Sequence, residues 1–209
     1  SIFLGSGALA DAFFVAFRIP NTFRRLFGEG SFNAAFIPSY SKELIKGKTN
    51  ARNFANNIFN LLSIFLLILI AIVELFMPIF VSIIAPGFKS NPEKFLLAVQ
   101  LTKITFPFIL FVSLASFFSA ILNSYNKFAA ASAAPIILNI FLILILLFGK
   151  ILDEKLVIYL SYGVSLAGFT QLIFLIVFVK KYFVPKIQIK FKITKKIKFF
   201  FQKLLPSIF

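Results

Sequence analysis

The stretch "IFNLLSIFLLILIAIVELFMPIFVSII", from Ile58 to Ile84, contains a single charged residue, Glu74. At about 1.5 Å of rise per residue, a helix of this length spans roughly 40 Å, which exceeds the hydrocarbon core of a bilayer, about 30 Å thick. The rest of the chain has the same character, since 60% of its 209 residues are hydrophobic and its mean hydropathy is +0.97. The sequence therefore predicts an integral membrane protein.

Hydrophobic segments recur along the chain and predict an all-α, polytopic transmembrane helical bundle. The first segment is less uniform than the others, because charged residues interrupt it. The chain begins with Ser1 rather than Met and ends inside an apparent helix, so we expect a piece of a longer polypeptide, with no signal peptide. The predicted transmembrane helices cover about 8–40, 58–84, 95–122, 130–148 and 156–179, followed by a basic connector at 180–194 and the start of a further helix at 195–209.

The net charge of +15 is concentrated in the connections between the segments. Nine lysines lie between Lys180 and Lys203, beside a hydrophobic span, which is typical of membrane topology and anionic lipid rather than of nucleic acid. Basic residues also gather in the predicted loop Ser41–Arg52 and at Lys127. The positive-inside rule places these three regions in the cytoplasm and the Ser1 side outside. The alternating residues 186–193 predict either an extended connector or a short interfacial helix.

The composition argues against an enzyme. The chain has no Cys and no His, and so lacks thiolates and the commonest metal ligand and general base. Glu74 stands alone in its span, which is more typical of a helix end or of inward packing than of catalysis. We predict no catalytic residue, no metal site and no cofactor.

One predicted helix carries an unusual amount of charge, in the stretch "RIPNTFRRLFGEG", Arg18–Gly30. An arginine at mid-bilayer costs about 2.5–3.5 kcal/mol on insertion scales, so these side chains must face protein or a water-filled cavity. Residues seven apart differ by only about 20° on an ideal helix, which groups Asp11, Arg18, Arg25 and Glu29 on one stripe. Arg24 lies about 100° away from Arg25, and we expect Pro20 to bend the helix between the two halves.

Two interpretations of these charges stay open from the residues alone. The charges can close on themselves, with Arg18 paired to Asp11 and Arg25 paired to Glu29, or with arginines reaching the membrane surface. Alternatively, the excess of cations lines a protected cavity for a phosphate or pyrophosphate, whose oxygens the arginine fork matches.

The sequence "GSGALADAFFVAFRIPNTFRRLFGEGSFNAAFIPSYSKEL", Gly5–Leu44, closely resembles the second-helix signature of the MurJ/MviN lipid II flippases. That family belongs to the multidrug/oligosaccharidyl-lipid/polysaccharide exporter superfamily. The resemblance continues in order along the chain, through "APGF" (Ala85–Phe88), "LTKITFPFIL" (Leu101–Leu110), "AILNSYNKF" (Ala120–Phe128), "AAPIILNI" (Ala133–Ile140) and "KLLPSIF" (Lys203–Phe209).

The resemblance implies a transporter with two lobes of helices around a cationic cavity, of which this chain supplies most of the N-terminal lobe. The first helix, with further cavity arginines, and the second lobe would be missing partners from the same polypeptide. The family's cavity arginine in "RRLF" is Arg24 here, and Arg18, Asp11 and Glu29 match further family positions. We follow the resemblance in ranking Arg24 above Arg25 as a substrate-binding residue, because a bend at Pro20 would undermine the ideal-helix phase.

The implied function is translocation of lipid II, a peptidoglycan precursor, across the bacterial cytoplasmic membrane by alternating access. Arg24, Arg18 and Arg25 would bind its pyrophosphate, while Asp11 and Glu29 would pair charges or gate. Membrane lipids are the other expected partners. Two alternatives remain at this stage, namely an exporter of another substrate in the same superfamily and a non-transporting membrane scaffold with structural charge pairs.

Overall fold

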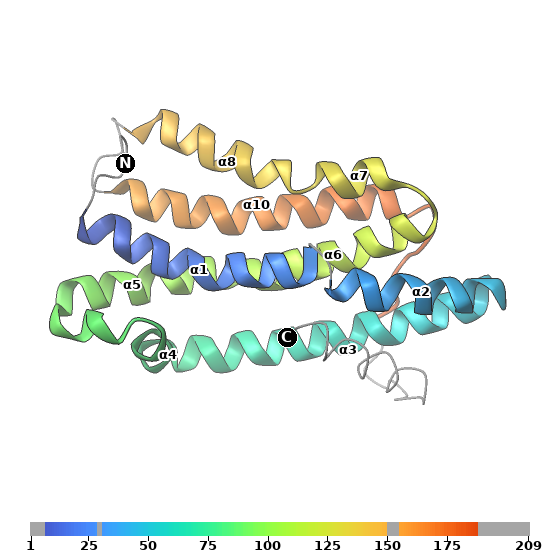
Figure 1. Cartoon of the computed structure of the whole chain (residues 1–209), viewed down its shortest axis with the longest axis horizontal. Helices are drawn as coiled ribbons and strands as arrows, with labels where there is room; N and C mark the ends of the chain where they lie inside the picture. The colour runs from blue at the N-terminus through green and yellow to red at the C-terminus, as the bar shows by residue number, and fades with distance from the viewer. Residues whose placement is uncertain (1–6, 29–30, 150–154, 188–209) are drawn as a thin grey trace.

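The computed structural model describes residues 7–28, 31–149 and 155–187. Within these ranges every regular element is a helix, which confirms the predicted all-α fold class. The helices lie side by side in an elongated bundle (Figure 1). They are α1 (Ala8–Gly28), α2 (Ser31–Ile45), α3 (Lys48–Leu75), α4 (Met77–Ile84), the 3-10 helix η1 (Pro86–Ser90), α5 (Pro92–Thr105), α6 (Phe108–Ser124), α7 (Phe128–Ala133), α8 (Ile136–Leu147) and α10 (Leu156–Val179). The predicted helix at 195–209 and most of the connector at 180–194 lie outside the described residues.

Helix α6 forms the centre of the bundle, because it contacts α1, α2, α3, α7 and α10. Its sequence carries no charge, and twelve of its 17 residues are buried. A helix that is apolar on all sides is typical of a core position. Phe117 illustrates the packing, since its ring lies 5.2 Å from the ring of Phe36 on α2 and 5.8 Å from that of Phe183 after α10.

Much of the outward surface of the bundle is also apolar. Ile68 on α3, Ile143 on α8 and Phe169 on α10 are each about half exposed. Such faces are suited to lipid acyl chains, because all backbone polar groups stay paired inside the helices. By length and composition, four helical stretches of the described residues can cross a membrane, and they cover Lys48–Leu75, Pro92–Ser124, Phe128–Leu147 and Leu156–Val179. The chain is therefore a multi-pass membrane protein.

Prolines have two different effects on these helices. Pro107 lies between α5 and α6, and Pro135 lies between α7 and α8. Near the first break, the carbonyl of Ile104 accepts a hydrogen bond from the hydroxyl of Ser165 on α10. In contrast, Pro20 and Pro38 lie inside α1 and α2 without ending them. A neighbouring helix can therefore satisfy backbone groups that a proline break disturbs.

The link between α2 and α3 is shorter than the loop predicted at Ser41–Arg52. It consists of Lys46 and Gly47 alone, and the rest of that basic stretch continues the two helices. Gly47 has a φ of 125°, which side-chain-bearing residues rarely adopt, so the chain reverses at this residue. Helix α3 begins at Lys48, whereas the predicted helix began near Ile58. The prediction relied on hydropathy, which does not detect polar helical turns.

The basic connections gather at one end of the bundle. Figure 1 shows the α2–α3 link, the α6–α7 turn and the last turn of α10 at this end, and η1 at the other. After α10, residues 183–187 have no regular secondary structure and return to α3. There Asn56 Oδ1 accepts the N–H of Lys186 at 3.0 Å, and Asn60 Nδ2 donates to the Lys186 carbonyl at 2.9 Å.

Candidate functional site

Helix α1 presents three of its four charged residues on one exposed face. Asp11, Arg18 and Arg25, spaced seven residues apart, are all exposed, whereas Ala16 and Pro20 on the opposite face are buried. We call Asp11, Arg18 and Arg25 the exposed stripe. Because charged side chains on a membrane helix avoid lipid, this face is suited to a hydrated space rather than to acyl chains.

Pro20 does not interrupt helix α1. Helix α1 runs without interruption from Ala8 to Gly28, and Arg25 stays on the same side as Arg18. Proline has no N–H, so it cannot form the usual helical hydrogen bond to the carbonyl four residues earlier, which is that of Ala16. Thr105 Oγ1 on α5 donates to this carbonyl at 2.9 Å. The packing of α5 therefore supports the helix at the position that proline weakens.

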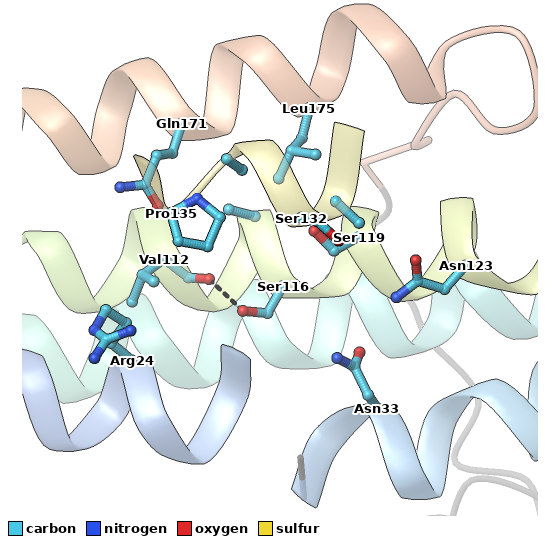
Figure 2. A pocket seen from close by; sticks show the side chains of 13 residues that line it. Arg24, Asn33, Val112, Ser116, Ser119, Asn123, Ser132, Pro135, Gln171 and Leu175 are labelled. Atoms are coloured by element: carbon cyan, nitrogen blue, oxygen red, sulfur yellow. Dashed lines mark hydrogen bonds between the residues drawn. The ribbon is translucent and has the colours of Figure 1, made fainter. Parts of the chain in front are cut away.

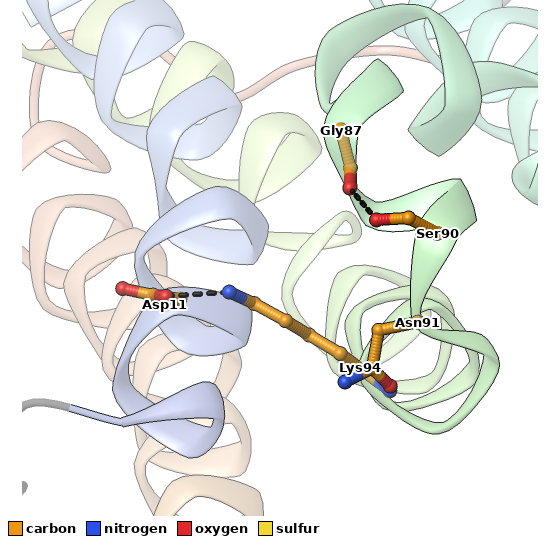
Figure 3. A network of polar contacts seen from close by, with 5 residues as sticks. All are labelled: Asp11, Gly87, Ser90, Asn91 and Lys94. Carbon is orange, nitrogen blue, oxygen red and sulfur yellow. Dashed lines mark hydrogen bonds and ion pairs between the residues drawn. The ribbon is translucent and has the colours of Figure 1, made fainter.

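Asp11 forms an ion pair across the bundle rather than along its own helix. Its Oδ2 lies 2.5 Å from Nζ of Lys94 on α5 (Figure 3). The ammonium of Lys94 also lies 4.3 Å from the centre of the Phe88 ring, in a cation–π contact. Asp11 thus pairs with Lys94 rather than with Arg18, the partner considered from the sequence. Arg18 lies two helical turns away from Asp11, about 10.5 Å along the axis.

Arg24 lies apart from the exposed stripe. Its side chain is half-buried, and its Nε donates to Asn21 Oδ1 at 3.1 Å. It lines a partly open cavity of about 330 Å³ between the helices, and among the described residues that line this cavity it alone is charged (Figure 2). The other lining residues come from α2, α6, α10 and the region around Pro135, and they are Asn33, Val112, Ala115, Ser116, Ser119, Asn123, Ala131, Ser132, Ala134, Pro135, Gln171 and Leu175.

The structure therefore divides the residues predicted for the site. Arg18 and Arg25 share the exposed stripe with Asp11, whereas Arg24 lines the cavity between the helices. Glu29 lies outside the described residues. Among the residues that the structure describes, no three Asp, Glu, His or Cys side chains gather into a possible metal site.

Sequence reasoning missed the polar wall of the cavity. Gln171, Asn33 and Asn123 lie on three helices and far apart in the chain, with no common spacing or motif. One signal in the sequence was available, namely a glutamine in the middle of the apolar helix α10, where a polar side chain is costly unless it serves a function.

Comparison with known proteins identifies the family. A sequence profile described as "Lipid II flippase MurJ" matches residues 1–209. Among curated proteins, the chain is 42% identical to the probable lipid II flippase MurJ of Rickettsia prowazekii over 178 residues, and 39% identical to that of Aquifex aeolicus over 210 residues. These alignments cover 85% and 99% of this chain but 35% and 40% of the two relatives. The chain thus spans little more than a third of the length of these relatives.

The fold gives the same result. Among solved structures, the chain is similar to a lipid II flippase MurJ in an inward closed conformation, with a TM-score of 0.80 and 27% sequence identity. The superposition covers 99% of this chain and 42% of that chain. Since the match extends over the whole sequence and over the order of its helices, the resemblance seen in the sequence is confirmed, and the chain belongs to the MurJ lipid II flippase family.

Proposed function

We propose that the complete protein containing this chain moves lipid II from the cytoplasmic to the periplasmic leaflet of the bacterial cytoplasmic membrane. The observation that carries the proposal is the position of Arg18 and Arg25 on one exposed face of α1, in a chain of the MurJ family. Its relatives are named as probable lipid II flippases.

The exposed stripe supplies the chemistry that a lipid-linked pyrophosphate requires. Arginine binds phosphate oxygens through two parallel N–H donors and keeps its charge at all relevant pH values. In the proposal, Arg18 and Arg25 contact the pyrophosphate from the face of α1, and Arg24 approaches it from the cavity that it lines. Asp11, paired with Lys94, limits the positive charge at the far end of the stripe.

A second lobe completes the site in this proposal. The exposed stripe faces a water-filled space between two lobes, which rock between inward-open and outward-open arrangements around the bound headgroup. The lipid tail stays in the bilayer throughout, and no covalent bond of the substrate changes. The basic end of the bundle, with Lys46, Lys127 and Lys180, faces the cytoplasm, in accord with the positive-inside rule.

Depletion of the complete protein in its own cells tests the proposal. We expect lipid II to accumulate in the inner leaflet, and re-expression of the natural protein to reverse the accumulation. Normal distribution of lipid II after depletion, in cells without a second flippase, would contradict the assigned substrate. A change in the export of a different lipid-linked polysaccharide would favour another cargo of the same superfamily.

A further inference from the structure

The cavity beside Arg24 holds an unusual concentration of unpaired polar atoms among the described residues. The described residues contain six buried side-chain polar atoms without a hydrogen-bond partner. Three of these six atoms line this one cavity, and they are Asn33 Oδ1, Asn123 Oδ1 and Gln171 Nε2. A buried polar group that loses water without gaining a partner costs about 1–3 kcal/mol, so three in one place indicate that the cavity accommodates a polar guest.

Gln171 provides the strongest of these observations. Its side chain is only 3% exposed, and it lies in the interior of the 24-residue helix α10, whose sequence is otherwise mostly apolar. A buried amide is unexpected at such a position. Figure 2 shows its amide directed from α10 toward the side of the cavity where Arg24 lies, with Asn33 and Asn123 farther along the cavity. The unpaired atoms are thus spread along its length rather than gathered at one point.

The chemistry of the lining selects the kind of guest. Gln171 offers a donor, Asn33 and Asn123 offer acceptors, and the hydroxyls of Ser119 and Ser132 can do both. Apart from Arg24 at one end, the lining residues that the structure describes are uncharged. A volume of about 330 Å³ lies at the lower end of the range found for small-ligand sites, about 300–1,000 Å³. This combination fits a neutral group rich in hydroxyls and amides.

We infer that the cavity binds the sugar portion of the lipid-linked headgroup, through Gln171, Asn33 and Asn123. The inference rests on the proposed function and extends it, since it assigns sugar recognition to residues separate from the arginines of the exposed stripe. Arg24, at one end of the cavity, marks the boundary between the sugar-binding residues and the cations that hold the pyrophosphate.

The test compares two ligands with the complete protein in lipid nanodiscs. One ligand is undecaprenyl pyrophosphate, and the other is undecaprenyl pyrophosphate that carries a disaccharide without peptide. The variant Gln171→Met removes the amide and keeps the shape of the side chain. We expect it to weaken binding of the sugar-bearing lipid about 2- to 10-fold, the effect of one neutral hydrogen bond, and to leave binding of the sugar-free lipid unchanged. Asn123→Leu should act in the same direction.

A matched control separates recognition from folding. Ser63 on α3 also has a buried, unpaired hydroxyl but does not line the cavity, so Ser63→Ala should leave both affinities unchanged. The thermal stability of Gln171→Met should stay the same or rise, because an unpaired buried group is lost.

Three results would overturn the inference. The first is unchanged affinity for the sugar-bearing lipid in both variants, as expected if the cavity holds only ordered water. The second is an equal loss for both lipids. The third is a loss of sugar affinity that Ser63→Ala reproduces. If the natural protein binds neither lipid, the proposed function fails as well, and the two failures are thereby distinguished.

Discussion

The hydroxyl of Thr105 on α5 donates a hydrogen bond to the carbonyl of Ala16 on α1, at 2.9 Å. This carbonyl is the one that Pro20, four residues later, cannot pair, because proline has no N–H. Both Thr105 and Pro20 are buried, so water cannot replace the bond. The contact keeps α1 continuous on either side of Pro20, and so keeps Arg18 and Arg25 on the same face.

A double-mutant cycle tests this relationship. Thr105→Val removes the hydroxyl at nearly constant shape and should destabilise the complete protein by about 1 kcal/mol, a typical value for hydrogen bonds between membrane helices. Pro20→Ala restores an N–H that pairs with the Ala16 carbonyl within the helix, so Thr105→Val should cost much less in that background. Unfolding in detergent gives the four stabilities, and equal costs in the two backgrounds would show that the bond does not compensate for the proline.

The ion pair between Asp11 and Lys94 should contribute little to stability. The Asp11 side chain is 57% exposed, and exposed ion pairs contribute about 0–1 kcal/mol. Lys94 is only 19% exposed and also contacts the Phe88 ring, so Lys94→Met should cost more than Asp11→Asn. The stability of both variants is measured by thermal unfolding at low and at high salt. Because salt screens the ion pair, each variant should lose less stability at high salt than at low salt. A salt-independent loss in Asp11→Asn would point to a packing defect instead.

The asparagine pair on α3 predicts a protected backbone amide after α10. The N–H of Lys186 donates to Asn56 Oδ1, and the Lys186 carbonyl accepts from Asn60 Nδ2. In Asn56→Leu we expect the Lys186 amide to exchange its hydrogen about 10-fold faster, which corresponds to the loss of about one hydrogen bond.

Asn53→Leu, at an exposed position on the same helix, is the matched control and should leave this exchange rate unchanged. Hydrogen–deuterium exchange followed by mass spectrometry reports both variants. Equal protection of residues 183–187 in Asn56→Leu and in the natural protein would mean that the asparagines do not hold the connector.

The contact between α6 and α10 depends on Gly168. A Cβ at this position would lie 2.5 Å from Cδ2 of Phe108 and 3.3 Å from Cβ of Phe111. Gly168→Ala should therefore destabilise the bundle by about 1–3 kcal/mol through overpacking. Gly87→Ala, where an added Cβ meets no atom within 4 Å, should have little effect and serves as the control. Equal melting temperatures for the two variants would contradict the close packing.

The fold class could be predicted because it depends on local composition. A run such as Ile58–Ile84 is too long and too apolar for a soluble helix, whatever surrounds it. The breaks could not be predicted as well, since Pro107 accompanies the end of a helix while Pro20 does not. The difference lies in tertiary contacts, such as the hydroxyl of Thr105 on a helix remote in sequence.

The candidate site could be predicted only in part, for the same reason. A spacing of seven residues was sufficient to group Arg18 with Arg25 on one face of a helix. The partner of Asp11, by contrast, is Lys94, which lies 83 residues away. The cavity beside Arg24 depends on the packing of α1, α2, α6 and α10, so Gln171 could not be connected with Arg24 before the fold was known.

Transport of fluorescent lipid II across the membrane of vesicles that contain the complete protein tests the central claim most directly. The account predicts that the natural protein exposes the label to an impermeant quencher, and that the double variant Arg18→Gln, Arg25→Gln lowers the rate at least about 100-fold, as expected for the loss of two charge-assisted contacts. The double variant Lys48→Gln, Arg52→Gln, an equal loss of two charges at exposed positions on α3, should leave the rate unchanged. A double variant that folds and transports lipid II at the natural rate would contradict the account.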